Sequence, residues 1–167
     1  MNGKSLHDYP LMPLATATEY FDTRNHFILQ ELNFDRETCQ REAIRLLESL
    51  TDEQKNIFNQ VMKATNHPTD GFFFVYGFGG TGKTFVWNAL TASIRARGGV
   101  VINVASSGIA ATLLPSGRTA HSRFAIPIDI NEDSMRNISQ SSPLSELIRC
   151  AKLIIWDEAP MVKRFCA

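Results

Sequence analysis

The chain has 167 residues, of which 44% are hydrophobic and 20% charged, and this composition suits one globular domain with a buried core. Basic and acidic residues are equal at 17 each, so no overall positive charge argues for nucleic-acid binding, which would have to rest on a local surface. The three cysteines form no zinc pattern, and no apolar run has the length of a signal peptide or a membrane span. We therefore expect an intracellular protein in a reducing compartment, neither secreted nor bound to a membrane.

The first part of the chain predicts little regular structure. Pro10 and Pro13 break any early helix, and the apolar run Phe27–Leu29 predicts one or two short helical turns. Arg36–Leu50 is a stronger prediction, because its apolar residues form one stripe at helical spacing. A fresh helix then starts at Thr51, a good N-cap residue.

Residues 77–84 read Gly-Phe-Gly-Gly-Thr-Gly-Lys-Thr and fit the spacing G-x-x-x-x-G-K-[ST] without a mismatch. The run before it, Phe72–Tyr76, is aromatic and β-branched and predicts a buried strand. The run after it, Phe85–Arg97, has apolar residues at helical spacing. A strand, this loop and a helix in that order indicate a phosphate-binding loop rather than a glycine-rich turn that binds nothing.

The residue types explain the expected chemistry. Glycines allow several backbone N–H groups to point at one anion, and the following helix adds the positive end of its dipole. Lys83 would reach the β- and γ-phosphates of ATP, and Thr84 would offer its hydroxyl to Mg²⁺. The expected nucleotide-binding residues of the loop are Gly77, Gly79, Gly80, Thr81, Gly82, Lys83 and Thr84.

Strand and helix patterns alternate through the rest of the chain. This alternation predicts an α/β fold in which helices flank a parallel sheet, as in P-loop NTPases. The expected elements are a strand at Val100–Val104, a helix at Ile109–Leu114, a loop at Ser116–His121, a short strand at Phe124–Ile128, an irregular stretch at Asp129–Ser142, a helix at Pro143–Cys150 and a buried strand at Leu153–Trp156.

Two acidic residues, Asp157 and Glu158, directly follow the last of these strands. The carboxyl end of a parallel strand lies beside the phosphate-binding loop in open α/β sheets, so this pair has the position of a Walker B segment. Asp157 would hold Mg²⁺ and Glu158 would deprotonate the attacking water. A solvated loop is the alternative interpretation of the pair.

The same residues indicate the class of P-loop protein. The Asn-Lys-x-Asp motif by which GTPases recognise guanine is not present, and a glutamate beside the aspartate favours an ATPase over a small-molecule kinase.

Gln54 has two interpretations. It lies three residues after Thr51, so its side chain can complete a capping box at the start of the helix. Its amide also carries both a donor and an acceptor, which matches the edge of adenine. The sequence leaves both roles open, and one side chain cannot fully make both sets of bonds.

Together these motifs resemble the Pif-type DNA helicases of superfamily 1B, over about Leu50 to Lys163. The ordered matches are LTDEQ at 50–54 for the Q motif, GFGGTGKT at 77–84 for motif I, ASSGIAA at 105–111 for motif Ia, GRTAHS at 117–122 for a DNA-contacting motif and DEAPM at 157–161 for motif II. The resemblance implies a RecA-like ATP-binding domain and favours the adenine role for Gln54.

The first residues resemble the segment that precedes the helicase in Helitron transposon proteins and their plant relatives. The matching stretches are LHDYPLMPL at 6–14 and ELNF at 31–34. Residues 1–46 are accordingly expected to be a weakly structured lead-in, and residues 47–167 a partial ATP-binding domain.

The resemblance also places a DNA surface on the chain. It implies that the motif Ia segment and the segment Thr119–His121 lie under single-stranded DNA. A helix start suits a DNA phosphate, but helix capping and a structural loop histidine are the ordinary alternatives. The expected DNA-contacting residues are Ser106, Ser107, Gly108, Thr119 and His121.

The chain departs from the family by ending soon after motif II, so we expect a truncated domain. The second RecA-like domain and the arginines that act on ATP across the cleft are expected to be missing, and the chain alone to be inactive. By resemblance the whole protein is an ATP-dependent 5′→3′ DNA helicase of DNA repair, recombination and telomere maintenance, in the nucleus or else in mitochondria. The rival interpretations are a nucleotide-binding module without catalytic output and a small-molecule kinase.

Overall fold

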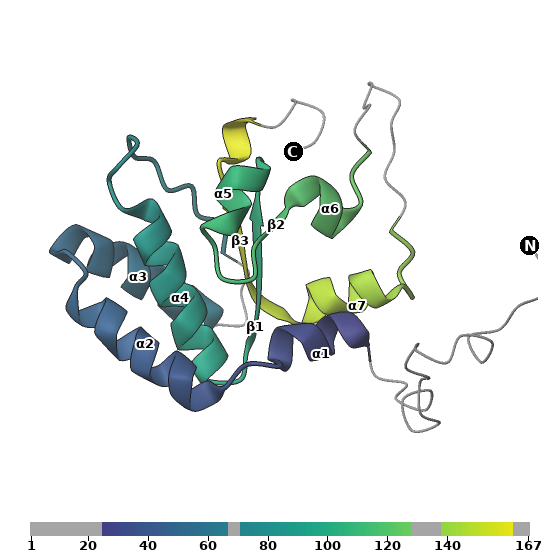
Figure 1. Ribbon diagram of the computed structural model, residues 1–167, viewed down its shortest axis with the longest axis horizontal. Helices are drawn as coiled ribbons and strands as arrows, with labels where there is room; N and C mark the ends of the chain where they lie inside the picture. The colour runs from purple at the N-terminus through teal and green to yellow at the C-terminus, as the bar shows by residue number, and fades with distance from the viewer. Residues whose placement is uncertain (1–24, 67–70, 128–137, 162–167) are drawn as a thin grey trace, which may run out of the picture.

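The computed structural model describes residues 25–66, 71–127 and 138–161. A small parallel sheet with the strand order β2-β1-β3 lies between two groups of helices (Figure 1). The strands are β1 (Val100–Ala105), β2 (Arg118–Thr119) and β3 (Ala151–Asp157). The helices are α1 (His26–Leu32), α2 (Arg36–Glu48), α3 (Asp52–Thr65), α4 (Lys83–Ala96), α5 (Gly108–Thr112), α6 (Ala120–Phe124) and α7 (Pro143–Cys150), followed by a 3-10 turn, η2 (Ala159–Met161). The predicted α/β class, a parallel sheet flanked by helices, is confirmed.

Helix starts follow the local capping signals. Asp35 caps α2 by accepting hydrogen bonds from the backbone N–H groups of Glu37 and Thr38. Thr51 caps α3 in a full capping box with Gln54, as the sequence predicts. Ser142 caps α7, which has a proline at its first position. These local devices explain why the predicted helix positions agree with the structure to within a few residues.

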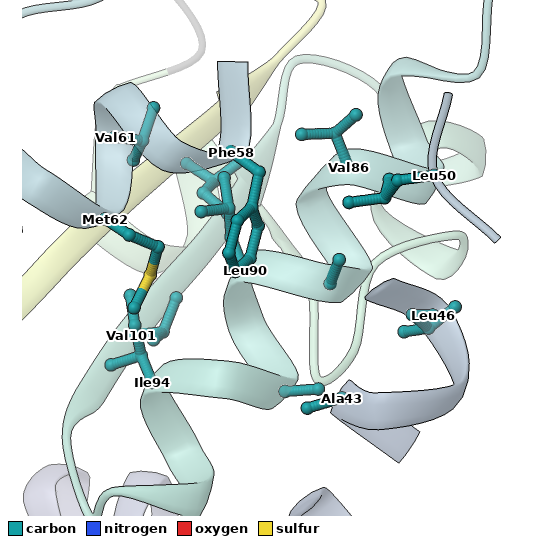
Figure 2. Packing of buried hydrophobic residues seen from close by; sticks show 13 residues of the cluster. Ala43, Leu46, Leu50, Phe58, Val61, Met62, Val86, Leu90, Ile94 and Val101 are labelled. Atoms are coloured by element: carbon teal, nitrogen blue, oxygen red, sulfur yellow. The ribbon is translucent and has the colours of Figure 1, made fainter. Parts of the chain in front are cut away.

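One face of the sheet is covered by α4, which packs on α2 and α3 (Figure 1). In β1, Val101 points to this face together with Ile155 of β3. Figure 2 shows the cluster in which α2, α3 and α4 bring their apolar side chains together above these strands. Its buried members are Ala43, Leu46, Leu50, Phe58, Val61, Met62, Val86, Ala89, Leu90, Ala92, Ile94, Val101 and Ile155. Burial of this apolar surface holds the helical layer on the sheet.

The opposite face is covered by α1, α6 and α7 (Figure 1). The alternate β1 residues Val100, Ile102 and Val104 point here, as the period of two in a strand requires. They form a buried cluster with Ala120 and Phe124 of α6 and Leu147 of α7, against which Phe27 and Ile28 of α1 pack. Both faces of the central strand are therefore covered, and β1 is buried along its whole length.

The prediction of a buried strand at Phe72–Tyr76 is wrong. The segment is in no strand or helix, and Phe72, Phe74 and Tyr76 are 93%, 68% and 78% exposed. A strand needs hydrogen-bonding neighbours, and in the described part of the chain β3 pairs with β1 alone and leaves its other edge without a strand. The composition of the segment is that of a strand, but no edge of the observed sheet is joined to it.

The expected short strand at Phe124–Ile128 is also wrong over the residues that the structure describes. Phe124 ends α6, and Ala125 follows in a left-handed conformation that stops the helix. The expected loop at Ser116–His121 contains β2 and the first turn of α6 instead. Thr119 caps α6 by accepting a hydrogen bond from the backbone N–H of Ser122, and this local signal was overlooked.

Some expectations concern parts of the chain outside the described residues. These are the Helitron-like stretch at 6–14 and most of the irregular stretch at 129–142. Among the described helices, none is long and apolar enough to cross a membrane.

Candidate nucleotide site and nucleic-acid interface

The glycine-rich loop at 77–82 leads directly into α4. Gly80 and Gly82 have φ values of +83° and +78°, which side-chain-bearing residues rarely adopt, and Gly82 is the N-cap of the helix. The ammonium of Lys83 donates to the carbonyls of Gly77 at 2.7 Å and Phe78 at 2.9 Å. The Lys83 charge is therefore held against the loop, at the end of α4 where the helix dipole is positive.

An added side chain at two of these positions would displace a neighbouring side chain. A Cβ on Gly77 would lie 2.8 Å from Oγ1 of Thr81, and a Cβ on Gly82 would lie 2.6 Å from Nε2 of Gln54. Around Gly79 and Gly80, by contrast, no atom lies within 4 Å of an added Cβ. The loop is therefore close to other side chains at Gly77 and Gly82 and open at Gly79 and Gly80.

Gln54 makes the capping box and also contacts the loop. Its Oε1 accepts a hydrogen bond from the Thr51 backbone N–H at 3.1 Å, and its Nε2 donates to the Thr81 carbonyl at 3.3 Å. The amide of Gln54 therefore joins the start of α3 to the phosphate-binding loop. Its place beside the loop is compatible with the adenine role, which remains a prediction.

Asp157 lies at the carboxyl end of β3 and is buried. Its Oδ1 accepts a hydrogen bond from Nε1 of Trp87 at 3.3 Å. Trp87 lies three residues after Thr84 on α4, so both side chains emerge from the same side of the helix. The Trp87 bond therefore brings the carboxylate to the side of α4 that carries the Thr84 hydroxyl.

This pair of oxygen groups fits Mg²⁺. A carboxylate and a hydroxyl are hard oxygen ligands, and Mg²⁺ usually takes one or two carboxylates and completes its shell with waters and substrate phosphates. No group of three or more His, Cys, Asp or Glu side chains that could hold a metal occurs in the described ranges.

Glu158 is bound to both serines of the segment that follows β1. The hydroxyl of Ser107 donates to Oε2 of Glu158 at 3.1 Å, and the hydroxyl of Ser106 donates to the Glu158 carbonyl at 2.6 Å. Glu158 has a φ of +55°, an uncommon conformation for a residue with a side chain. The candidate catalytic glutamate and the candidate DNA-contacting serines thus form one hydrogen-bonded group.

The remaining candidate DNA contacts lie at the same edge of the sheet. Ala105 is level with Thr119 of β2 on one side and with Asp157 of β3 on the other. Ser106 follows Ala105, while His121 lies in the first turn of α6, after Thr119. Ser107 caps α5 by accepting from the Ala110 backbone N–H, so the predicted capping role is present. All these side chains therefore belong to the carboxyl edge of the sheet, where ligands bind in open α/β folds.

Comparison with known proteins identifies the family of the chain. The model of the PIF1-like helicase family matches residues 49–167. The chain belongs to the PIF1-like helicase family. It is also similar to an ATP-dependent DNA helicase Pif1 of Psychrobacter sp. (strain PRwf-1), with 35% identity over 91 residues. This match covers 53% of the chain and 14% of the bacterial protein, so the chain spans a small part of the length of that relative.

Two tryptophans of this PIF1-like site were overlooked in the sequence. Trp87 donates to Asp157, and Nε1 of Trp156 donates to the Ser106 hydroxyl at 3.1 Å. Helical spacing puts Trp87 on the Thr84 side of α4, and Trp156 directly precedes the acidic pair, so their positions carried a signal. Their partners are 70 and 50 residues away in the chain, which local patterns cannot reveal.

Proposed function

We propose that this member of the PIF1-like helicase family binds ATP with Mg²⁺ at the loop 77–84 and acts as the ATP-driven motor domain of a DNA helicase. The observation that supports this most strongly is the hydrogen bond between Trp87 and Asp157, because it joins the phosphate-binding helix to the acidic end of β3. A glycine-rich turn without function would not need a buried carboxylate beside it.

The proposed roles follow the positions of the groups. Lys83 and the loop N–H groups bind the phosphates, and Thr84 with Asp157 holds Mg²⁺, which neutralises phosphate charge when bound. Glu158 orients and deprotonates the attacking water. Gln54 contacts adenine by sharing or replacing one of the bonds that its amide makes to Thr51 and Thr81.

We propose single-stranded DNA as the second ligand, on the edge formed by Ser106, Ser107, Gly108, Thr119 and His121. Hydroxyls and a helix-start N–H group suit phosphate oxygens and position a strand without reading its sequence. Because Ser107 also donates to the carboxylate of Glu158, DNA phosphates and the catalytic glutamate would share a donor. Family membership further supports our proposals of 5′→3′ movement, of a role in DNA repair, recombination or telomere maintenance, and of a nuclear or mitochondrial location.

Replacement of Lys83 by alanine tests the nucleotide site. The variant removes the charge that faces the phosphates, so Mg²⁺-ATP affinity measured by calorimetry should fall to the limit of detection. Because Lys83 also donates two hydrogen bonds to the loop, a thermal melt must accompany the titration.

Lys63→Ala is the matched control, because Lys63 is an exposed lysine in the last turn of α3, outside the loop. It should bind ATP like the unchanged chain. Equal ATP affinity in Lys83→Ala and the control would refute the phosphate-binding role of the loop.

A further inference from the structure

A buried charge cluster joins three elements that are far apart in the sequence. Glu31 of α1 accepts a hydrogen bond from Nη2 of Arg95 of α4 at 3.1 Å and another from Nη2 of Arg123 of α6. All three residues are at most 6% exposed. One carboxylate therefore connects the helix that starts at the phosphate-binding loop with the helix that carries the proposed DNA contact His121.

The cluster depends on Glu31 more than on either arginine. Burial lowers the pKa of Arg95, and the neighbouring Glu31 carboxylate opposes this effect. Without the carboxylate, two guanidinium groups would face each other away from water. Among the residues that the structure describes, Nε of Arg95 and Nη1 of Arg123 have no hydrogen-bond partner. Cζ of Arg95 lies 3.7 Å from the centroid of the Phe34 ring, and this cation–π contact stabilises the Arg95 charge less strongly than a carboxylate does.

Helix α6 needs such an anchor. It has five residues, and a helix of that length is not stable by itself in water. In the described part of the chain its attachments include the burial of Ala120 and Phe124 against the sheet and the ion pair of Arg123 with Glu31. Apolar contacts resist separation but tolerate sliding, whereas a buried ion pair fixes direction.

Helix α1 is itself fixed in place, so it can serve as the fixed point. Its N-cap residue Asn25 donates to the Pro143 carbonyl and to Oε2 of Glu146 at the start of α7. Phe27 and Ile28 pack against the buried cluster that contains Val100, Ile102 and Val104 of β1. The 14-residue helix α4, in turn, packs against β1, α2 and α3, and its buried residues run from Val86 to Arg95.

We propose that Glu31 is a positioning residue that fixes α6, and with it Thr119 and His121, relative to the phosphate-binding helix α4. Residue 31 lies outside the range 49–167 that the family model matches, so this role belongs to the N-terminal segment rather than to the matched domain. The inference about DNA binding rests on the proposed function, whereas the inference about the position of α6 relative to α4 is independent of it.

The test uses Glu31→Gln in the full chain, which keeps the shape of the side chain and removes its charge. Hydrogen–deuterium exchange, read by mass spectrometry, should rise about tenfold or more in peptides that cover α6, because the buried arginines lose their counter-charge. Affinity for a labelled oligothymidylate strand should fall at least about fivefold, the lower end of ordinary coupling between sites. Affinity for Mg²⁺-ATP should stay within about twofold, because α4 keeps its packing on α2 and α3.

Leu46→Ala is the matched control for a merely structural effect. Leu46 is a buried residue of α2 in the cluster on the other side of the sheet, so its loss destabilises the domain without touching α6. If Glu31→Gln raises exchange evenly over α2, α4 and α6, as this control should, or leaves α6 unchanged, the positioning role is overturned.

Two further outcomes remain decisive. If the unchanged chain binds no oligothymidylate, the proposed DNA role fails, while exchange in α6 still decides whether Glu31 positions that helix. If Glu31→Gln does not fold, Arg123→Met removes the ion pair between residues 31 and 123 and leaves the Glu31–Arg95 pair intact. Hydrogen–deuterium exchange should then rise in α6 alone, and unchanged exchange in α6 would overturn the proposal.

Discussion

At the scale of single residues, Gln54 shows how one side chain serves structure and site together. Its acceptor oxygen closes the capping box of α3, and its donor nitrogen contacts the Thr81 carbonyl in the phosphate-binding loop. Both polar atoms of the amide are therefore engaged. A nucleotide base that hydrogen-bonds to Gln54 must share or replace one of these bonds.

Replacement of Gln54 by alanine separates the two roles when it is compared with Thr51→Ala. Both variants lose the capping box, so both should unfold with a free energy lower by about 1 kcal/mol. Only Gln54→Ala removes the amide, so it alone should weaken ATP while leaving GTP nearly unchanged. Thermal melts beside ATP and GTP titrations make the comparison. If the two variants lose ATP affinity equally, Gln54 is only a cap.

The candidate site could be predicted where its signals are local. The motif at 77–84 has a fixed internal spacing, the pair Asp157-Glu158 directly follows a recognisable strand, and Ser107 is a helix cap that the sequence itself indicates. The hydrogen bonds of Trp87 to Asp157 and of Ser107 to Glu158 could not be predicted, because each joins residues more than 50 positions apart. Spacing reveals which residues belong to a site, and tertiary packing decides which atoms meet.

At the scale of elements, Phe72–Tyr76 shows the corresponding limit for the fold. The positions of strands β1 and β3 were predicted correctly because they are apolar runs that pair with each other. The expected burial of residues 153–156 is wrong, because Ile154 is 42% exposed and only Ile155 is buried. Phe72–Tyr76 is an equally apolar run, but strand formation depends on a neighbouring edge that the run itself does not encode. Helices are predicted more reliably from local sequence, since their hydrogen bonds are internal and their capping residues are adjacent to them in sequence.

The exposed aromatic segment gives a prediction for the behaviour of the chain. Exposed large apolar residues near an open strand edge favour association between copies. Phe72→Ser combined with Phe74→Ser should reduce concentration-dependent light scattering and dye binding to apolar surface. Because both side chains are exposed, the free energy of unfolding should change by no more than about 0.5 kcal/mol.

Phe85→Ser is the control for this pair, because Phe85 is partly buried and packs against the cluster of α2, α3 and α4. It should lower the free energy of unfolding by at least about 2 kcal/mol. A loss of that size in the double variant instead would mean that Phe72 and Phe74 are packed in solution, as the strand prediction requires.

At the scale of the whole molecule, the domain extends beyond the part that the family model matches. The match begins at residue 49, yet α1 and α2 precede it and lie on opposite sides of the sheet, with α2 packed on α4 (Figure 1). In α2, Ala43 and Leu46 are buried against the α4 side, and in α1 Phe27 and Ile28 pack on the α7 side. The described part of the N-terminal segment is thus integrated into the core rather than attached to its surface.

Deletion of α1 tests this integration. A chain that begins at residue 35 keeps the N-cap of α2 but loses the cover of Phe27 and Ile28 and the counter-charge of Glu31. A chain that begins at residue 25 keeps all three and is the reference. Because removal of one partner leaves buried charge uncompensated, the shorter chain should lose at least about 3 kcal/mol in its free energy of unfolding by urea. It should also bind more dye, because the apolar face of β1 and α7 is uncovered. If α1 were only a passive attachment, the two chains would unfold at the same urea concentration, and the domain boundary would then lie at the start of α2.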